Sequence, residues 1–431
     1  MTNTKPTSGH DRRDLWTLKS RPEWLARFNE LGSLIDIKSV VPLDETSLLA
    51  AASERTGLTD FGDGDGWRLH FRKLLEVIEA EAKLNFFGRI LTRTDFVNYL
   101  CVRLAITNAY KLHPEIDQQK ITEPVFILGF GRSGTTILHE VLALDPQFRS
   151  VRRWEAMYPW PAPEPATYDT DPRIKKANDF VELVWRASPE WRAMHAWGGD
   201  LPVEDIEFTY SAFMSEVWVT AFQIPTYEKY FEKQDVAYHL AWHKRFLKLL
   251  QWKHPKPHWL LKNPTHMPRL PKLLEAYPDA KIIIPHRDPI TSNDSVVNVM
   301  GVIYSWRTDD PYGGGVGDEW MMPEPRAKVW DMVIDQIDTG KLRKGFYTNV
   351  LYADFMKDPG PAIQNIYKDL GLNLSDDIHK KMLAFLDERH KGSLGNTSKY
   401  DKLAADDPQM LRERAVYKRY QDYFGVPNET G

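Results

Sequence analysis

Residues 121–139 read ITEPVFILGFGRSGTTILH, and this stretch decides how the fold of the chain is interpreted. The apolar run Val125–Leu128 predicts a buried β-strand, and the spacing of apolar residues from Ile137 onward predicts a helix. A glycine-rich turn, Gly129–Gly134, lies between them. Glycines let the backbone curl with its amides pointing inward, and a helix N-terminus adds partial positive charge. The stretch therefore predicts a strand, loop and helix that bind an anion.

The turn has the glycine spacing of a P-loop but lacks the P-loop lysine. Gly129 and Gly134 stand as in G-x-x-x-x-G-K-[ST], whereas Thr135 occupies the lysine position. Arg132 is the only cation inside the loop. An ordinary glycine-rich turn is the alternative, but the internal arginine and the pair Thr135 and Thr136 argue against it. We expect the loop to hold a phosphate without the lysine that NTPases place on the β/γ-phosphates.

Composition excludes several classes of protein. The chain has 431 residues, a formal net charge of −4 and one cysteine. This charge gives no electrostatic reason to bind nucleic acid, and one cysteine excludes an internal disulfide. No apolar run approaches the roughly 20 residues that a membrane helix needs, and the polar N-terminus shows no secretory signal. We therefore expect a cytoplasmic protein with no membrane span and no nucleic-acid partner.

The predicted architecture is α/β, with a P-loop-like central parallel sheet of about five strands flanked by helices. We expect a disordered tail over residues 1–15 and a helical region packed on the core over residues 16–120. Residues 121–431 would form the α/β domain, with a helical insertion on the acceptor side over about 155–255. The glycine-rich segment 307–322 would be a mobile lid.

Two details of this architecture are specific enough to compare with a structure. Apolar spacing predicts helices over Trp67–Ala82 and Thr94–Ala109. Pro202, followed by Glu204, Asp205 and Glu207, is typical of the first turn of a helix, although one of these carboxylates could still face a pocket.

Three basic residues share one placement in the predicted sheet. Arg132, Lys262 and Arg287 each follow an apolar run with strand character. The run before Arg287, Lys281–Pro285, is continuous and β-branched, which is typical of a buried parallel strand. Ligands of such sheets bind outside the carboxyl ends of the strands. We therefore expect these three side chains to share one anionic ligand.

The motif RSGTT, residues 132–136, resembles the 5′-phosphosulfate loop of sulfotransferases that use PAPS (3′-phosphoadenosine 5′-phosphosulfate). In that family the 3′-phosphate is bound by an arginine after a strand and by a serine eight residues later. Arg287 and Ser295 have this spacing. The chain also looks like the bacterial branch of the family that resembles tyrosylprotein sulfotransferases.

A third family element, R-K-G-x-x-G, is similar to HKGSLG at residues 390–395. Lys391 and Gly392 match it, whereas His390 replaces the family's arginine. The resemblance implies that PAPS is the co-substrate and that no metal is needed, because a sulfuryl group bears less charge than a phosphoryl group. The donor-binding residues would be Gly131, Arg132, Ser133, Gly134, Thr135, Thr136, Arg287, Ser295, Lys391 and Gly392.

The same resemblance assigns the catalytic residues. Lys262 and Arg132 would stabilise charge in the transition state of in-line sulfuryl transfer. Glu155 is the first choice for the general base, and His266 is the second. The structural alternatives are that Glu155 pairs with Arg152 or Arg153, and that His266 caps the following helix. His195 and Glu204 are weaker candidates for the base.

The acceptor is less defined than the donor. More than half of the 15 tryptophans lie between Trp154 and Trp259. Most of them would pack in the core, and the others would form a pocket for a small aromatic or apolar acceptor with a hydroxyl or amine. A homodimer is compatible with the sequence, which leaves the oligomeric state and the acceptor open.

Two other functions compete with sulfuryl transfer. A P-loop-type nucleotide kinase would need a lysine after Gly134 and an acidic Mg²⁺ ligand at a strand end. Thr135, and the lack of an apolar run that ends in Asp, argue against this function. A non-catalytic nucleotide-binding relative would need neither Lys262 nor Glu155.

Overall fold

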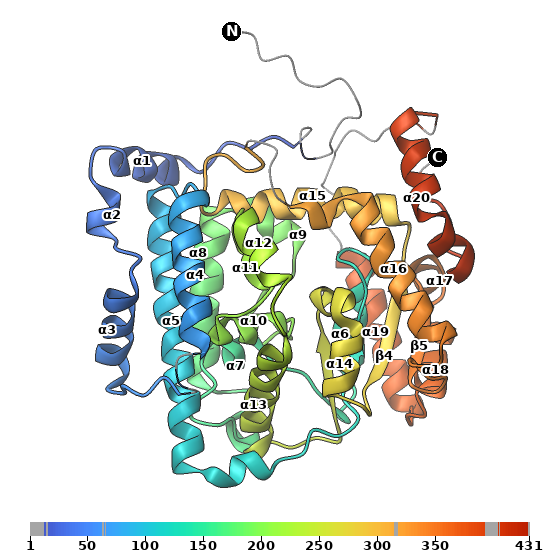
Figure 1. Cartoon of the computed structure of the whole chain (residues 1–431). Coiled ribbons are helices and arrows are strands. Elements are labelled where there is room, and N and C mark those ends of the chain that lie inside the picture. The colour runs from blue at the N-terminus through green and yellow to red at the C-terminus, as the bar shows by residue number, and fades with distance from the viewer. Residues whose placement is uncertain are drawn as a thin grey trace.

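Five parallel strands form the central sheet in the order β2-β3-β1-β4-β5, which confirms the predicted fold class and sheet size (Figure 1). The computed structural model describes residues 13, 16–62, 64, 66–313, 318–392, 404 and 406–429, without the side chains of residues 390–392. The strands are β1 (Val125–Ile127), β2 (Phe148–Arg149), β3 (His258–Lys262), β4 (Lys281–His286) and β5 (Tyr347–Leu351). Strand β2 was not predicted, because two residues are too short to show a pattern.

Helices precede, interrupt and follow the sheet. Before β1 lie α1 (Glu23–Gly32), α2 (Ile37–Val40), α3 (Glu45–Thr56), α4 (Gly66–Glu81), α5 (Phe86–Leu112) and the 3₁₀ helix η2 (Pro114–Gln118). Helix α6 (Thr135–Leu142) follows β1. Between β2 and β3 lie α7 (Arg153–Met157), η3 (Pro165–Thr167), α8 (Pro172–Ala187), α9 (Pro189–Met194), α10 (Ile206–Thr209), η4 (Tyr210–Ala212), α11 (Val217–Ala221), α12 (Pro225–Phe231) and α13 (Ala237–Lys253).

The second half of the chain alternates strands and helices. Its helices are η5 (Pro264–Arg269), α14 (Leu270–Ala276), α15 (Pro289–Ser305), η6 (Glu319–Met321), α16 (Pro323–Asp338), α17 (Tyr352–Lys357), α18 (Pro359–Asp369), α19 (Asp376–Gly392) and α20 (Pro408–Phe424). Among the described residues, no helix has both the length and the apolar character needed to cross a membrane.

Strand β1 lies in the middle of the sheet and packs on both faces. Val125 and Ile127 belong to a hydrophobic cluster with residues of α6, α18 and α19, whereas Phe126 belongs to a larger cluster with α4, α5 and α13. Successive side chains of a strand point to opposite faces, so a strand covered by helices on both faces is apolar throughout. The N-terminal and mid-chain helices therefore share a core with one face of the sheet.

Several predictions about local structure need correction or lie outside the described residues. Helix α5 begins at Phe86, eight residues before the predicted start, because Asn85 caps it by accepting a hydrogen bond from the Gly88 amide at 2.8 Å. Pro202 begins no helix, and α10 starts at Ile206. All but one residue of the predicted tail, 1–15, and residues 314–317 of the predicted lid lie outside the described part.

Gly88 shows how closely α5 approaches the loop that follows α15. A Cβ atom at this position would lie 2.1 Å from the Arg307 carbonyl oxygen and 2.4 Å from its Cα. These are backbone atoms, so neither can turn away. Only glycine lets the two segments meet here.

Replacing Gly88 with alanine should therefore lower the free energy of unfolding by about 1–3 kcal/mol, the usual cost of overpacking. Urea denaturation followed by circular dichroism would measure this loss. Gly66→Ala is the matched control, because a Cβ at Gly66 would have no atom within 4 Å and the unfolding free energy should change by less than about 0.5 kcal/mol. Equal stability of both variants would contradict the packing argument.

Candidate active site

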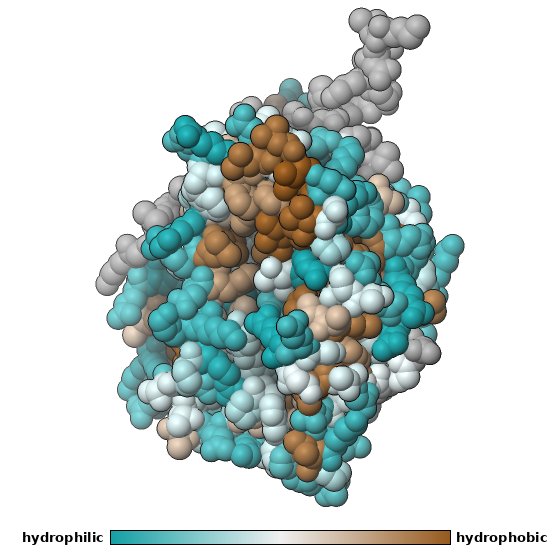
Figure 2. All heavy atoms as spheres, turned by 90° about the vertical axis from the view of Figure 1, so that its left-hand side faces the viewer, coloured by the Kyte–Doolittle hydropathy of each residue, from teal (hydrophilic) through white to brown (hydrophobic). Residues whose placement is uncertain are grey.

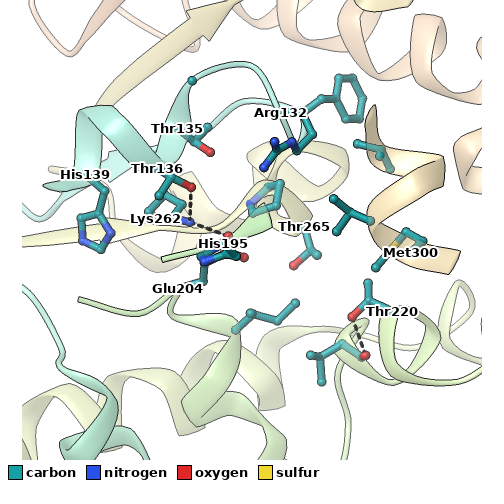
Figure 3. Close-up of a pocket in the computed structure, with 18 of the residues that line it drawn as sticks. Arg132, Thr135, Thr136, His139, His195, Glu204, Thr220, Lys262, Thr265 and Met300 are labelled. Carbon is teal, nitrogen blue, oxygen red and sulfur yellow. Dashed lines mark hydrogen bonds and ion pairs between the residues drawn. The ribbon is translucent and has the colours of Figure 1, made fainter. Parts of the chain in front are cut away.

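A cavity of about 790 Å³ opens at the carboxyl ends of the strands. Its wall includes Gly131–Thr136 apart from Ser133, and also Lys262, Arg287 and Tyr352, which follow or end β3, β4 and β5. Figure 3 shows Arg132, Thr135, Thr136 and Lys262 gathered in this space. The parallel sheet thus brings together the basic residues that the sequence predicted to share a ligand.

The loop after β1 has a backbone that suits an anion. Arg132 has a φ of 70° and Gly134 a φ of 95°, and α6 begins directly after Gly134. A Cβ at Gly134 would lie 2.7 Å from the Tyr352 ring, so glycine is required for space as well as for conformation. The first amides of α6 have no acceptor within the helix and face the cavity, where they and the helix dipole favour a phosphate or sulfate.

Arg132, Arg287 and Ser295 meet at one end of the cavity. The Arg132 Nε donates to the Ser295 Oγ at 2.9 Å, and the Arg287 Nη1 donates to the Arg132 carbonyl at 3.0 Å. The Arg287 guanidinium also lies 4.3 Å from the centre of the Tyr352 ring. Ser133 differs from this group, because it is buried and its Oγ donates to the Phe130 carbonyl at 2.7 Å.

A carboxylate near the C-terminus reaches this end of the cavity. The Glu429 side chain accepts hydrogen bonds from Arg287 at 2.8 Å from both Nε and Nη2, and its backbone amide donates to Asp288 at 2.7 Å. Nothing in the spacing of residues predicted this contact. The contact places the Glu429 carboxylate against Arg287, the residue that the sequence predicts to bind a phosphate. Lys391 and Gly392 end α19, but their side chains lie outside the described residues.

Lys262 and Glu204 lie next to each other in the wall of the cavity. Its Nζ forms an ion pair with the Glu204 carboxylate and donates to the Thr136 Oγ1 at 3.4 Å (Figure 3). The Lys262 side chain is only 2% exposed, and that of Glu204 is 26% exposed. Burying an ammonium group without a partner costs free energy. Lys262 has two partners in the site, a carboxylate and a hydroxyl.

Two backbone hydrogen bonds hold Glu204 in place. The Val203 amide donates to the Val151 carbonyl at 2.9 Å, and the Asp205 amide donates to the Lys262 carbonyl at 3.1 Å. Glu204 lines the cavity, whereas Asp205 is buried and bonds to Asn263 and His266. This non-helical path replaces the helix expected at Pro202, and α10 begins only at Ile206.

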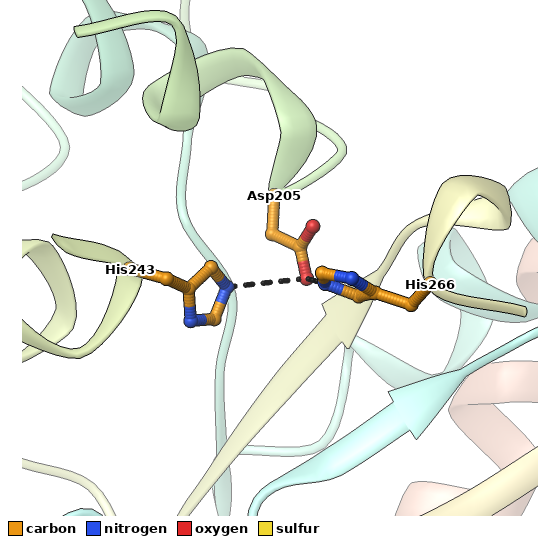
Figure 4. A group of neighbouring side chains, drawn as sticks. All are labelled: Asp205, His243 and His266. Atoms are coloured by element: carbon orange, nitrogen blue, oxygen red, sulfur yellow. Dashed lines mark hydrogen bonds and ion pairs between the residues drawn. The ribbon is translucent and has the colours of Figure 1, made fainter. Parts of the chain in front are cut away.

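Asp205 ties this segment to two histidines beneath the site (Figure 4). Its Oδ2 lies 3.1 Å from the His266 Nε2 and 3.3 Å from the His243 Nε2, and its Oδ1 accepts a hydrogen bond from Asn263 at 2.5 Å. The His243 Nδ1 lies 2.6 Å from the Tyr277 hydroxyl. Ligand atoms of Asp205, His243 and His266 lie within 4.8 Å of one another and could hold a metal ion, but here hydrogen bonds occupy both Asp205 oxygens.

The charge state of this network follows from its contacts. Burial favours a raised pKa for Asp205, but the charges and hydrogen bonds of His266 and His243 outweigh it and hold the pKa of Asp205 far below its ordinary value. Burial favours a lowered pKa for His266, but the charge and hydrogen bond of Asp205 raise the pKa of His266 above its ordinary value. The network is therefore a buried ion pair that supports the end of β3.

Glu155 does not lie where a general base is needed. It is fully buried, and its carboxylate accepts hydrogen bonds from Arg149 at 2.6 and 3.1 Å, from Tyr168 at 2.8 Å and from the Arg152 amide at 2.9 Å. It does not belong to the cavity wall. Its partner is thus Arg149, which precedes it on β2, rather than the side chain of Arg152 or Arg153.

His266 also lies outside the cavity wall, in the Asp205 network, and it does not cap the following helix α14, whose N-cap residue is Arg269. His195 does reach the cavity, where burial and the nearby Lys262 lower its pKa to about 3. Its imidazole is therefore neutral and very weakly basic at pH 7. Of the four candidate bases, Glu204 alone combines a carboxylate, a place in the cavity and contact with Lys262.

The opposite side of the cavity is rich in apolar side chains, although charged residues of the same region, Glu216, Glu228, Glu232, Arg269 and Glu319, also line it. Side chains of α15 form one wall and side chains of α9, α11, α12 and the following loops form the other; they include Trp191, Trp197, Val217, Val219, Phe231, Val296, Val299, Met300, Ile303 and Trp320. Other tryptophans of the middle region, such as Trp154, Trp218, Trp242 and Trp259, are buried in the core. The cavity thus has a basic end and an apolar end.

Replacing Asp205 with asparagine should lower the free energy of unfolding at pH 6 by about 3–5 kcal/mol, the usual cost of removing one partner of a buried ion pair. The raised pKa of His266 contributes stability that is complete below the unfolded value of about 6.5 and is lost as the pH rises through the folded pKa. The unfolding free energy of the native protein should therefore fall above pH 6.5, and that of the variant should not. Urea denaturation between pH 6 and 9 would test this, with Asp179→Asn, at an exposed ion pair, as the control. Parallel curves for the native protein and Asp205→Asn would contradict the ion pair.

Comparison with known proteins agrees with this geometry. A sequence model of the sulfotransferase family matches residues 124–376. The omega-hydroxy-beta-dihydromenaquinone-9 sulfotransferases Stf3 of Mycobacterium bovis and Mycobacterium tuberculosis are each 28% identical in an alignment of 273 residues that covers 58% of this chain. The chain spans 63% of the length of these curated relatives.

Solved structures show the same fold. Sulfotransferase STF9 from Mycobacterium avium is 23% identical, with a TM-score of 0.73 over 90% of this chain and 98% of that one. Sulfotransferase STF1 from Mycobacterium tuberculosis H37Rv is 24% identical, with a TM-score of 0.68 over 88% of this chain and 98% of that one. The matched segment runs from just before β1 to beyond β5 and contains Arg132, Lys262 and Arg287, and the chain belongs to the sulfotransferase family.

Proposed function

We propose that this protein transfers a sulfuryl group from PAPS to the hydroxyl, or amine, of an apolar or aromatic acceptor. One observation carries the proposal: the RSGTT loop, Lys262 and Arg287 meet around one cavity, and Ser295 bonds to Arg132 of that loop, although these residues come from distant parts of the chain. In the reaction, the bond between sulfur and the bridging phosphate oxygen breaks. A new bond forms between sulfur and the acceptor oxygen, and adenosine 3′,5′-bisphosphate leaves.

The donor would lie along the basic end of the cavity. The first amides of α6, with Thr135 and Thr136, would bind the 5′-phosphate and the sulfuryl oxygens. Arg287 would grip the 3′-phosphate through two parallel hydrogen bonds, since a guanidinium matches this geometry, and Ser295 would orient Arg132 beside it. Lys262 lies between this end and the apolar end, where negative charge on the bridging oxygen would develop.

Glu204 is the residue that we assign as general base. Its carboxylate faces the cavity beside Lys262, so a hydroxyl bound there could donate its proton to Glu204 as the new bond forms. The same contact lets Lys262 move from the carboxylate to the donor once the anionic substrate has entered. The two residues thus act on opposite sides of the reacting group.

The acceptor should be an apolar alcohol of lipid character. The curated relatives are named for an omega-hydroxy-beta-dihydromenaquinone-9, which is such an alcohol. In this chain the side of the cavity beyond Lys262 is lined by valine, methionine, isoleucine and tryptophan side chains. Apolar walls bind through burial of apolar area, so they favour a hydrocarbon chain or flat ring that carries one reactive hydroxyl.

Titration calorimetry without magnesium is the experiment that tests the donor site. Adenosine 3′,5′-bisphosphate should bind with micromolar affinity, and Arg287→Ala should weaken binding by at least tenfold, since hydrogen bonds to charged groups contribute about 1.5–3 kcal/mol. ATP and AMP are the comparison ligands. Tight binding of ATP with no response to the bisphosphate would overturn the proposal in favour of a nucleotide kinase.

Substitution of Lys262 and Glu204 tests the chemistry separately from binding. Lys262→Ala should lower kcat for sulfuryl transfer about 10²–10³-fold, and Glu204→Gln about 10²–10⁴-fold, while the bisphosphate still binds. Transfer of labelled sulfate to an apolar alcohol would measure both. Glu155→Gln is the contrasting variant, because its defect should be lost stability rather than lost chemistry. Full activity of Glu204→Gln would remove Glu204 from the mechanism.

The contact between Glu429 and Arg287 predicts an effect on donor affinity. The carboxylate competes with the 3′-phosphate, so Glu429→Gln should tighten bisphosphate binding by up to about fivefold, as expected for a partly exposed ion pair of at most about 1 kcal/mol. Asp422→Asn, at an exposed ion pair of α20, should leave the affinity unchanged. Weaker binding by Glu429→Gln would show that Glu429 orients Arg287 instead.

A further inference from the structure

Exposed apolar side chains are concentrated on the first two helices and on the segments before and between them. Of the twelve large apolar side chains that are exposed in the described part of the chain, six fall within residues 18–40. They are Leu18, Trp24, Leu31, Leu34, Ile35 and Val40, and we call them the α1–α2 patch; Leu34 is 76% exposed. Figure 2 shows a continuous apolar area on the face of the molecule where α1 and α2 lie. Large apolar patches on a protein surface usually mark an interaction site.

These side chains are exposed because the opposite side of α1 already packs against α5. Leu25 is buried, the Phe28 and Phe86 rings stack with their centres 4.8 Å apart, and a Cβ at Gly32 would lie 2.2 Å from the Phe86 Cβ. Helix α2 has only four residues, none of them buried. The apolar residues between Leu31 and Val40 thus add nothing to the core, although their exposure lowers the solubility of the protein.

The patch adjoins the apolar end of the cavity. Residues 16–22 connect α1 to the C-terminal end of α15, where the Arg21 guanidinium donates to the Ser305 and Thr308 carbonyls at 2.9 and 2.7 Å. Trp16 rests on Gly301 of α15 and packs in one cluster with Val299, Ile303 and Trp191, which line the cavity. The chain therefore runs directly from the exposed patch to the wall where the acceptor would bind.

We propose that the α1–α2 patch docks on the surface of a lipid bilayer and that the enzyme takes its apolar acceptor from that bilayer; this inference rests on the proposed function. An apolar alcohol of lipid character resides in membranes, so the acceptor end of the cavity has to meet a membrane. Two short helices and the turn between them, with leucine, isoleucine and tryptophan on their outer side, are suited to lie at the interface between headgroups and acyl chains.

Two observations favour a bilayer over other occupants of the patch. Helices α1 and α2 lie at the outer edge of the molecule, so they present a projecting edge rather than a groove for a partner (Figure 1). Nearby charges are matched, with Arg27 paired to Glu23 and Lys38 to Glu79. The contact should therefore be hydrophobic and little affected by salt or by anionic lipid.

Flotation with vesicles of phosphatidylcholine tests this inference. The full-length protein should float with the vesicles, and the double variant Leu34→Glu, Ile35→Glu should lose at least nine-tenths of this binding. Leu69→Glu is the matched control, because Leu69 is 63% exposed on α4, outside the patch, and its variant should float like the native protein. Circular dichroism would confirm that all three proteins are folded.

Three outcomes would overturn the inference. The native protein could fail to float, or the double variant could float equally well. The third is a dimer that analytical ultracentrifugation detects in the native protein and that the double variant loses, because a second copy would then cover the patch. Flotation needs no sulfuryl transfer, so vesicle binding by a protein that sulfates no alcohol would uphold the docking surface and refute only the proposed function.

Activity measurements add a second readout. For an apolar alcohol presented in vesicles, the double variant should transfer sulfate at least tenfold more slowly than the native protein. For a short water-soluble alcohol the two rates should be equal, because neither Leu34 nor Ile35 lines the cavity. Equal loss with both acceptors would indicate a folding defect and would contradict a role in docking.

Discussion

Parallel pairing of β1 with β3 and β4 is the constraint on which the candidate active site depends. The pairing sets Ile127 beside Lys262 on one side and beside Ile283 on the other. Because all these strands run in the same direction, their carboxyl ends open at one edge of the sheet. Arg132, Lys262 and Arg287 reach the same cavity for this reason, and the long helical segment between β2 and β3 can supply the rest of its wall without disturbing the strand ends.

The basic residues at this edge are neutralised by carboxylates of the protein itself. Lys262 pairs with Glu204, Arg287 with Glu429 and Arg389 with Glu140, and each of these cations lies on the cavity wall. Isolated charges in a partly closed cavity would be costly, so the carboxylates keep the site stable before an anion enters. An anionic donor would replace the pairings of Lys262 and Arg287, and release of Glu204 from Lys262 would leave a carboxylate free to accept a proton.

The two ends of the cavity match two very different substrates. The basic end suits a nucleotide with several negative charges, and the apolar end suits a hydrocarbon. Helix α15 serves both ends, because Ser295 near its beginning contacts Arg132 while Val299, Met300 and Ile303 line the apolar wall. The same helix receives Trp16 and Arg21 from the segment that leads to the α1–α2 patch. One helix thus contacts the proposed donor site, the proposed acceptor site and the segment that leads to the proposed docking surface.

The sequence by itself determined the fold class, the anion loop and the positions of Lys262 and Arg287, because these depend on local patterns: apolar strands, glycine spacing and residues at strand ends. Tertiary structure alone decided which carboxylate lies in the cavity beside Lys262. Glu155 has the expected neighbours in sequence, but Arg149 on the short strand β2 holds it in the core. Glu204 reaches Lys262 because the amides on either side of it, those of Val203 and Asp205, bond to the carbonyls of Val151 and Lys262, contacts over long sequence separations that no local pattern predicts. The contact of Glu429 with Arg287 could not be predicted for the same reason, because these two residues are also far apart in the sequence.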